Sequence, residues 1–256
     1  MIDHRADIHP EAKIAEDVTI GPWAVIGANV EIGSGCWIGP HTVINGPTKI
    51  GQNNKIFQFA SIGDAPQDVN YKGEPTELVI GDNNIIREYT TINRGSVKGG
   101  GRTKLGNDNF IMAYVHIGHD CQVGNNITFA SYGALSGHVT IEDFAIIGGY
   151  SAIHQFCTVG SYAFIAKACY VTKDVLPYMM IAGHDAEACG LNTVGLKRRG
   201  FSTETIENIR RAYKIIFRRG LTVAQSIEEL MTMTEACPEI QPFIHALQRS
   251  ERGIVR

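Results

Sequence analysis

The 256-residue sequence lacks a long apolar run, and no stretch approaches the roughly 20 apolar residues that a transmembrane helix needs. Residues 1–7 hold no basic segment leading into an apolar one, so we expect no secretory signal. Cations are not in excess, since 23 Lys and Arg stand against 26 Asp and Glu, which disfavours a general nucleic-acid binder. These absences predict a cytoplasmic protein that binds no nucleic acid and does not insert into a membrane.

The six cysteines form no Cys-x-x-Cys pair. We therefore expect reduced cysteines that pack as small apolar side chains. Charged residues are scarce at 19% of the chain, while the hydrophobic set makes up 44%. A sizeable core can therefore be buried, and global disorder is not expected.

Isoleucine occupies every sixth position from Ile8 to Ile62, ten times in succession. The same step relates Ile80 to Ile92 and, in a new phase, the apolar residues from Leu105 to Val171. A period of six fits neither a helix nor an alternating strand, but it fits a solenoid with one hexad on each flat side. Three hexads would make one triangular coil, with coils about 4.8 Å apart. Glycine often follows the inward residue, and we expect it to turn the corner, often with positive φ.

Two stretches interrupt the repeat, at residues 64–78 and 95–104. Both are predicted to project as loops, and insertions in a solenoid tend to lie on its functional face. The second loop contains three successive glycines, Gly99 to Gly101. They are not a phosphate-binding loop, because no GxxxxGK[ST] pattern is present, and plain flexibility is the favoured interpretation.

The repeat is predicted to end at Val171, because Pro177 and Gly183 occupy the next two six-step positions. From about residue 202 the apolar spacing becomes helical. Ser202 is a good N-cap, and Thr222 with the glutamine three residues later predicts a capping box for a second helix. A helical cap is therefore expected to cover the open end of the solenoid.

Four histidines cluster in the third run of the repeat. His119, His138 and His154 follow inward residues that are 18 positions apart, which predicts one side of three successive coils, with His116 at the preceding corner. Histidine titrates near neutral pH and could take a proton from a hydroxyl that attacks a thioester. Three imidazoles could instead hold zinc, or the histidines could merely decorate the surface. Four on one strip favour a functional site.

Three neighbouring features are more ambiguous. Asp120 follows His119, but neighbours on a strand point to opposite faces, so the sequence leaves its orienting role open. Gly137 could offer an unobstructed backbone N–H to an oxyanion, although many glycines in such a repeat serve only the turn. The basic run 197–199 suits a diphosphate, yet on its own it also fits a solvated turn.

The segments HIGHDC at 116–121 and LKRRGF at 196–201 resemble the UDP-N-acetylglucosamine acyltransferases of lipid A biosynthesis. Shorter matches lie at 58–63, 137–139 and 154–157, and the resemblance covers essentially the whole chain. The hexad alone would indicate only the broader superfamily.

The fold that the resemblance implies is mainly β. It is a left-handed parallel β-helix of hexapeptide repeats over residues 1–190, with the loops at 64–78 and 95–104. A C-terminal α-helical domain follows at residues 191–256.

The resemblance also implies an activity. A (3R)-3-hydroxyacyl chain moves from acyl carrier protein to the 3-position of UDP-N-acetylglucosamine, which is the first step of lipid A biosynthesis. The enzyme would be a homotrimer with active sites in the clefts between neighbouring solenoids. No metal or bound cofactor is implied, since the thioester of the carrier protein's phosphopantetheine already supplies an activated carbonyl.

Site residues are implied position by position. His119 matches the general base, Gly137 matches the oxyanion donor, and Asp120 completes the catalytic candidates. Asp68 matches a residue that binds the sugar. The other candidates match substrate-binding positions: Gln67, His116, His138, His154, Gln155, Asn192, Arg198 and Arg199.

Three positions depart from the family's pattern. Asn70 stands where the family often has Lys, although Lys72 lies nearby, and Val194 stands where Glu is common. Both bear on how the UDP-sugar is bound. Lys167 occupies the position that often limits acyl length, typically Gly in long-chain enzymes, so we expect a shorter acyl chain.

Alternative functions remain open at this point. The acceptor could be a UDP 3-amino sugar, which would give an amide. A sister N-acyltransferase shares the hexad but usually carries an extra N-terminal domain, whereas here the repeat begins at Ile8. A γ-class carbonic anhydrase-like enzyme would need zinc and has no use for the LKRRGF segment. A non-enzymatic scaffold would tolerate replacement of His119.

Overall fold

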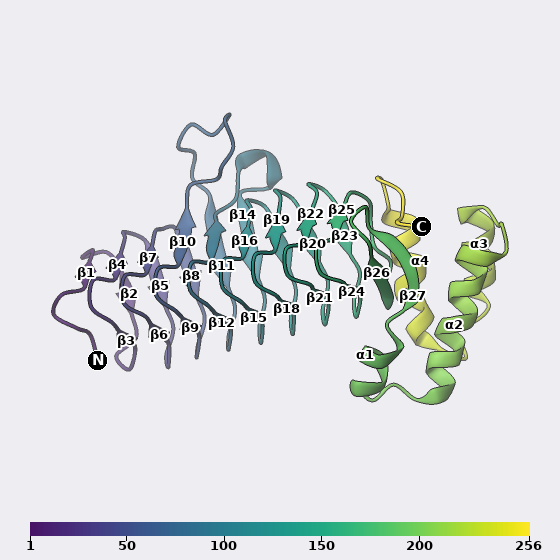
Figure 1. Cartoon of the computed structure of the whole chain (residues 1–256). Helices are drawn as coiled ribbons and strands as arrows, with labels where there is room; N and C mark the ends of the chain where they lie inside the picture. The colour runs from purple at the N-terminus through teal and green to yellow at the C-terminus, as the bar shows by residue number, and fades with distance from the viewer.

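Each hexad forms one short strand and one turn, and three hexads complete one coil. Each hexad therefore stacks on the hexad three positions earlier in the sequence of hexads. The computed structural model describes all residues 1–256 and shows a long three-sided solenoid of parallel strands with helices at one end (Figure 1). The inward residue is buried on every coil from Ile20 onward, whereas Ile8 and Ile14 at the N-terminal end are half-buried. Ile44 and Ile62, for example, are neighbours in register and fully inaccessible. Identical positions therefore stack one coil apart, which explains why the sequence keeps isoleucine at this position.

Three sheets form the sides of the solenoid. The first sheet consists of β1 (Asp7–Ile8), β4 (Val25–Ile26), β7 (Val43–Ile44), β10 (Ser61–Asp64), β13 (Thr91–Asn93), β16 (His116–Ile117), β19 (Ala134–Leu135), β22 (Ala152–Ile153) and β25 (Tyr170–Val171). The second consists of β2 (Lys13–Ile14), β5 (Val30–Ile32), β8 (Thr48–Ile50), β11 (Glu77–Ile80), β14 (Arg102–Leu105), β17 (Gln122–Val123), β20 (Thr140–Ile141) and β23 (Thr158–Val159). The third consists of β3 (Thr19–Ile20), β6 (Trp37–Ile38), β9 (Lys55–Ile56), β12 (Ile85–Ile86), β15 (Phe110–Ile111), β18 (Thr128–Phe129), β21 (Ile146–Ile147), β24 (Phe164–Ile165), β26 (Met179–Ala182) and β27 (Glu187–Leu191).

The turns do not use glycine as the sequence predicted. Among the six glycines that follow inward isoleucines in the first run, only Gly63 has a positive φ. The left-handed residue usually lies three positions after the inward one and is not glycine, as at Asn53 (φ 54°) and Tyr114 (φ 62°). Glycine is needed instead where coils approach closely. A Cβ on Gly33 would lie 2.6 Å from the carbonyl oxygen of Gly51 on the next coil.

Side chains of one kind also stack along the solenoid. At the corner between the second and third sheets, the buried side chains of Asn54, Asn84 and Asn109 form a ladder. The Asn84 amide donates to Asn54 Oδ1 and to the Gly106 carbonyl, both at 2.9 Å, while Asn84 Oδ1 accepts the Asn109 N–H at 3.0 Å. These bonds satisfy backbone groups that the turns leave unpaired inside the coil.

At the corner between the third and first sheets, exposed rings form a continuous stack. Successive ring centroids are 4.7 to 5.1 Å apart. The stacked residues are His41, Phe59, Tyr89, Tyr114, Tyr132 and Tyr150. We call this row the aromatic stack.

The two predicted loops project together from one side of the solenoid (Figure 1). Both are shorter than predicted, because strand pairing extends into their ends: β11 begins at Glu77 and β14 at Arg102, and these two residues are in register. The second loop contains a 3-10 turn, η1 (Val97–Gly99). All six cysteines are free, and all but Cys189 are buried.

The solenoid does not stop at Val171, so this prediction was wrong. Val175 bridges Val159, and Ile181 of β26 pairs with Ile165. The inward position thus recurs after a step of four residues and then again after six, which a strict six-step count misses. β27 then pairs antiparallel with β26, and Ile254 bridges Asp174, so the last coil is covered by the chain itself.

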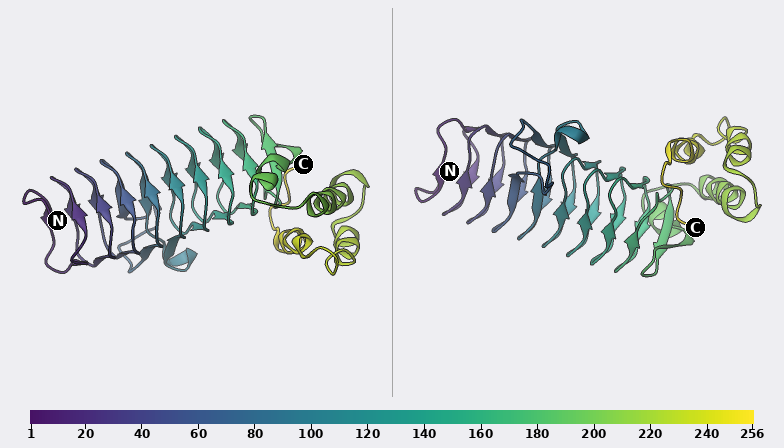
Figure 2. Two further views of the ribbon diagram at one scale, coloured as in Figure 1. Left: turned by 90° about the horizontal axis from the view of Figure 1, so that it is seen from below. Right: turned by 90° about the horizontal axis from the view of Figure 1, so that it is seen from above.

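Helices follow the last coil: α1 (Thr193–Arg198), α2 (Thr203–Arg218), α3 (Val223–Met231), η2 (Pro238–Ile240) and α4 (Gln241–Arg249). The Ser202 cap and the Thr222–Gln225 capping box are present, as predicted. Figure 2 shows the helices gathered at the end of the solenoid opposite the N-terminus. A single apolar core continues from the coils into the helices. None of these helices combines the length and apolarity that crossing a membrane would require.

The asparagine ladder leads to a test of stability. Asn84→Ala should lower the free energy of unfolding by about 2–4 kcal/mol, because it leaves the buried Gly106 carbonyl and Asn109 N–H without partners and removes one of the two donors to Asn54 Oδ1. Asn107→Ala, in a parallel but half-exposed ladder, should cost less than about 1 kcal/mol, since water can replace its bonds. Urea unfolding measures both, and equal losses would show that burial of the ladder is unimportant.

Candidate active site

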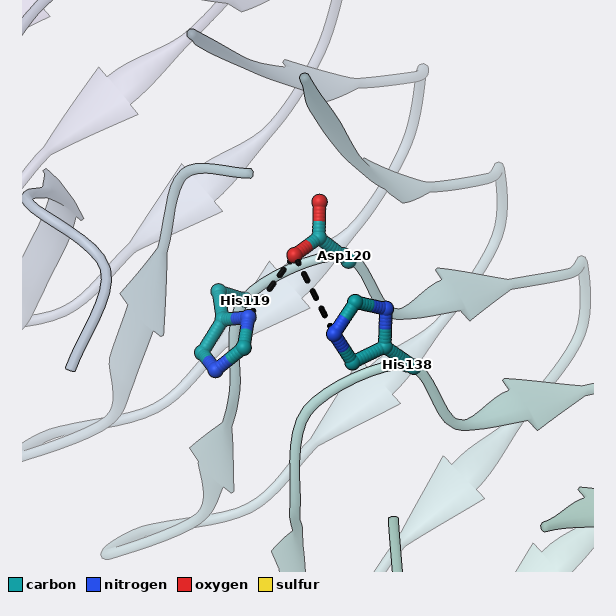
Figure 3. Close-up of side chains that lie close together, drawn as sticks. All are labelled: His119, Asp120 and His138. Atoms are coloured by element: carbon teal, nitrogen blue, oxygen red, sulfur yellow. Dashed lines mark hydrogen bonds and ion pairs between the residues drawn. The ribbon is translucent and has the colours of Figure 1, made fainter. Parts of the chain in front are cut away.

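The predicted histidines lie where strands of the first sheet end. His119 and Asp120 follow β16, and His138 follows β19 one coil further on. The two projecting loops interrupt the same corner on the two preceding coils, at β10–β11 and β13–β14. Figure 3 shows the imidazoles of His119 and His138 on either side of the Asp120 carboxylate. The repeat therefore gathers both histidines, the carboxylate and the loops at one corner.

Asp120 does orient His119, although the strand rule left this open. Asp120 lies in a turn with φ 62°, and its Oδ2 is 2.7 Å from His119 Nδ1. A carboxylate accepts hydrogen bonds, so His119 donates its Nδ1–H, and Nε2 is left as the acceptor. The Asp120 side chain is buried, whereas 16% of the His119 side chain is exposed. The imidazole can therefore be reached by a substrate while its partner is shielded from water.

Gly137 lies directly beneath the imidazole of His119 on the next coil. A Cβ at this position would lie 2.6 Å from His119 Cε1 and 2.7 Å from Nε2, so only glycine lets the ring settle there. The Gly137 N–H donates no hydrogen bond within the chain, whereas the N–H groups of Ser136 and His138 on either side are paired. The ring edge that carries the free nitrogen of His119 thus packs against a residue with an unpaired backbone donor.

His138 and His116 complete the cluster around His119. His138 Nε2 is 3.7 Å from Asp120 Oδ2, and its ring stacks on Phe156 at 4.5 Å. His116 Nδ1 lies 2.7 Å from the hydroxyl of Thr91. Burial lowers the pKa of both His116 and His138, which favours their neutral forms.

His154 is separate from this cluster. It follows a strand of the same sheet, as predicted, but it is the first residue after its inward position, whereas His119 is the second and His138 the third. His154 contacts the carbonyl of Gln155 and the edge of Tyr170 instead. The ligand atoms that lie within 4.8 Å of one another belong to His119, Asp120 and His138. A zinc site built from the three predicted imidazoles therefore lacks the third one.

Asp68, in the first loop, faces the second loop across a pocket of about 170 Å³. Its carboxylate accepts hydrogen bonds from the backbone N–H and the side chain of Asn70, at 2.9 and 3.0 Å. These bonds, with a smaller contribution from the positive charge of Lys98, lower the pKa of Asp68. Asn70, the departure noted above, thus orients Asp68. The neighbouring Gln67 is exposed.

The remaining candidates lie near the helical end of the chain. Asn192 caps α1 and donates to the Tyr162 carbonyl, Arg199 lies over the ring of Phe144 at 4.4 Å, and Arg198 is exposed on α1. Lys167 is exposed in the turn after β24. Several coils separate these residues from His119 of the same chain (Figure 1). A single chain does not bring the two groups together.

Sequence reasoning missed the groups that hold Asp120 from the second loop. Ser96 donates to this carboxylate through both its N–H and its hydroxyl. No periodic signal marks Ser96, because it lies in an insertion, and the glycines beside it were interpreted as a sign of flexibility.

Comparison with known proteins points to one family. Residues 174–255 match the family described as UDP N-acetylglucosamine O-acyltransferase, domain 2, and residues 29–64 and 102–132 match the bacterial transferase hexapeptide family. Relatives named acyl-[acyl-carrier-protein]–UDP-N-acetylglucosamine O-acyltransferase, from Saccharophagus degradans and Thermodesulfovibrio yellowstonii, are each 52% identical over 100% of this chain and 99% of their own length.

Solved structures agree with these relatives. The UDP-N-acetylglucosamine acyltransferase of Francisella novicida superposes with a TM-score of 0.98 at 47% identity, covering 100% of this chain and 94% of that one. The UDP-N-acetylglucosamine O-acyltransferase of Moraxella catarrhalis has a TM-score of 0.98 at 43% identity, covering 100% and 99%. The predicted fold is confirmed: a mainly β chain that forms a left-handed parallel β-helix with a C-terminal helical cap.

Burial of His116 predicts a pH dependence of stability. The pKa of His116 is lowered from its ordinary 6.5, so below that pH the unfolded chain binds more protons than the native one, and stability falls as pH falls. His116→Gln should flatten this fall. The thermal midpoint, followed from about pH 7.5 to about pH 5.5, should drop less in His116→Gln than in the wild type. His9→Gln, at an exposed position, should behave like the wild type. An unchanged slope in His116→Gln would refute the assignment.

Proposed function

Because the chain belongs to the acyl-[acyl-carrier-protein]–UDP-N-acetylglucosamine O-acyltransferase family, we propose that it transfers a (3R)-3-hydroxyacyl chain to the 3-hydroxyl of UDP-N-acetylglucosamine. The donor is acyl carrier protein, and the reaction is the first step of lipid A biosynthesis. One observation from the site carries the mechanism: the imidazole edge with the free nitrogen of His119 packs against Gly137, a residue whose N–H is unpaired. A base and an oxyanion donor are the two groups that acyl transfer from a thioester needs.

In the proposed mechanism, His119 Nε2 removes the proton of the sugar hydroxyl as its oxygen attacks the thioester carbonyl. The Asp120 carboxylate, hydrogen-bonded to Nδ1–H, stabilises the imidazolium that forms. The N–H of Gly137 donates to the carbonyl oxygen as negative charge develops on it. The C–O bond forms and the C–S bond breaks. The departing phosphopantetheine sulfur then receives the proton from the imidazolium, and His119 returns to its neutral form.

Substrate binding is divided between the two groups of residues described above. The sugar is bound close to its reacting hydroxyl by Asp68 and Gln67 on the first loop. His116 and His138, which lie beside the His119–Asp120 pair, contribute to the same binding. The carboxylate of Asp68 is suited to accept sugar hydroxyl groups, and its lowered pKa keeps it charged near neutral pH.

We assign the other substrate-binding residues to clefts between copies of the chain. Arg198 and Arg199 bind the diphosphate, Asn192 binds nearby, and His154 and Gln155 line the cleft. A homotrimer would bring these residues to His119 of a neighbouring copy, which a single chain cannot do. The exposed aromatic stack supports the proposal, because an apolar strip of this length is suited to burial against another subunit.

The reaction needs neither a metal nor a bound cofactor. The thioester is already activated, and His154, the third imidazole of the predicted strip, lies outside the cluster of ligand atoms formed by His119, Asp120 and His138, which argues against a zinc centre built from that strip. A cytoplasmic location follows from the proposal, because the donor is a carrier protein of the cytoplasm.

The decisive experiment measures acyl transfer with purified protein, UDP-N-acetylglucosamine and 3-hydroxyacyl carrier proteins of several chain lengths. His119→Ala should lower kcat by roughly 10²- to 10⁴-fold, because the attacking hydroxyl loses its base. His9 is exposed at the N-terminal end of the solenoid, and His9→Ala should leave kcat unchanged. If the wild-type protein acylates only the UDP 3-amino sugar, the acceptor in this proposal is wrong and the product is an amide. If it acylates neither sugar, the proposal fails.

The side chain of Lys167 should set the acyl length. Lys167→Gly removes a long side chain from an exposed turn and should shift kcat/KM toward longer acyl chains by about tenfold, because each added methylene that can be buried contributes about 0.8 kcal/mol. Lys167→Met keeps the length without the charge and should keep the wild-type preference. If Met and Gly variants behave alike, charge rather than length is responsible.

A further inference from the structure

The second loop folds back over the carboxylate of Asp120. Asp120 is 4% exposed and Ser96 is 3% exposed, so this contact is closed to water. The backbone N–H of Ser96 donates to Asp120 Oδ1 at 2.8 Å, and its hydroxyl donates to Oδ2 at 2.7 Å. A single residue of the loop therefore binds both oxygens of the carboxylate.

Packing around this contact leaves the loop little freedom. A Cβ on Gly99 would lie 2.0 Å from Asp120 Cγ, so glycine is required for the η1 turn to reach the carboxylate. The carbonyl of Ser96 accepts the N–H groups of Gly99 and Gly101, at 3.1 and 2.8 Å. Thr103, at the end of the loop, accepts the N–H of Asp120 at 2.7 Å. The three glycines thus make a hydrogen-bonded turn against Asp120.

Asp120 Oδ2 has two competing imidazole partners. His119 Nδ1 lies 2.7 Å from it, and His138 Nε2 lies 3.7 Å from it on the other side. A small rotation of the carboxylate would lengthen the first contact and shorten the second. Two donors from Ser96, one on each oxygen, fix the plane of the carboxylate and prevent that rotation.

We propose that Ser96 is a positioning residue, which holds Asp120 so that its Oδ2 is committed to His119 and not to His138. This inference rests on the proposed acyl transfer, in which His119 must present Nε2 to the sugar hydroxyl. Ser96 lies at the edge of the pocket at Asp68, but its N–H and its hydroxyl both donate to Asp120 and are not free to bind the sugar. It acts through Asp120, and the second loop exists in part to deliver it.

The first test is Ser96→Ala, which removes the hydroxyl and keeps the backbone N–H. The expected result is a fall in kcat of about 10- to 100-fold, with KM for UDP-N-acetylglucosamine changed by less than about threefold, because positioning of the base is lost and not binding. Ser96→Thr restores a hydroxyl and should recover most of kcat. Wild-type kcat in Ser96→Ala would overturn the proposal.

The chain provides a matched control at Asp174. Its Oδ1 accepts the N–H of Thr158 at 2.8 Å, and its Oδ2 accepts the hydroxyl of Ser250 at 2.7 Å, so one backbone N–H and one serine hydroxyl bind this carboxylate as at Asp120, here from two residues. Ser250→Ala should lower the thermal midpoint about as much as Ser96→Ala and leave kcat unchanged. If Ser250→Ala reduces kcat equally, the effect of Ser96 is one of general stability, and the proposal fails.

A double-mutant cycle separates action through Asp120 from any other role. In an Asp120→Asn background, Ser96→Ala should cause no further loss of kcat, since the carboxylate it positions is gone. Losses that multiply would overturn the proposal.

A crystal structure of Ser96→Ala tests the geometry without relying on activity. The Asp120 carboxylate should rotate away from His119 toward His138, and an unchanged contact with His119 would overturn the inference. A wild-type protein without acyl-transfer activity would defeat the proposed function instead, and the crystal structure would still decide the role of Ser96.

Discussion

The pairing of each strand with the equivalent strand one coil away is the interaction on which the rest of the molecule depends. Most strands are only two residues long, so no strand pair is stable alone, and stability accumulates along the stack. Because the register repeats, like stacks on like: isoleucine in the core, asparagine at one corner and aromatic rings at another. The same register makes residues that are a coil apart in sequence into neighbours, which is how His119 comes to lie over Gly137.

The active site arises where this regularity is broken. His119 needs a glycine one coil on, and His138 occupies the left-handed turn position that Asp120 occupies on the coil before. The left-handed backbone is the ordinary turn conformation of the repeat, but a buried carboxylate costs stability when it has no partners. Here Ser96 and Thr103 supply donors and an acceptor from the second loop, and the rigid coils on either side fix the turn. The insertion therefore compensates locally for a feature that the repeat cannot support.

Much of this architecture could be predicted from the sequence, because the inward residue recurs with a fixed period and helix caps have local signatures. The phase change after Val171 could not, since a step of four residues is invisible to a six-step count. The role of Asp120 in orienting His119 was left open because the alternation of side chains along a strand was applied to it. That alternation does not hold for a residue in a left-handed turn. His154 lies on the same side of the solenoid as His119, but it occupies a different position within its hexad. Its side chain therefore contacts Gln155 and not the His119 cluster.

Contacts from an insertion are harder to foresee than contacts within the repeat. Residues in the repeat have neighbours fixed by counting, whereas Ser96 reaches Asp120 only because β11 and β14 pair and bring the base of the second loop over the corner. The same pairing aligns the two loops, so residues of one short turn both line the pocket at Asp68 and contact Asp120. Sugar binding and orientation of the base thus share a structural element. A change in the length of either loop would disturb both, even though every coil below would remain intact.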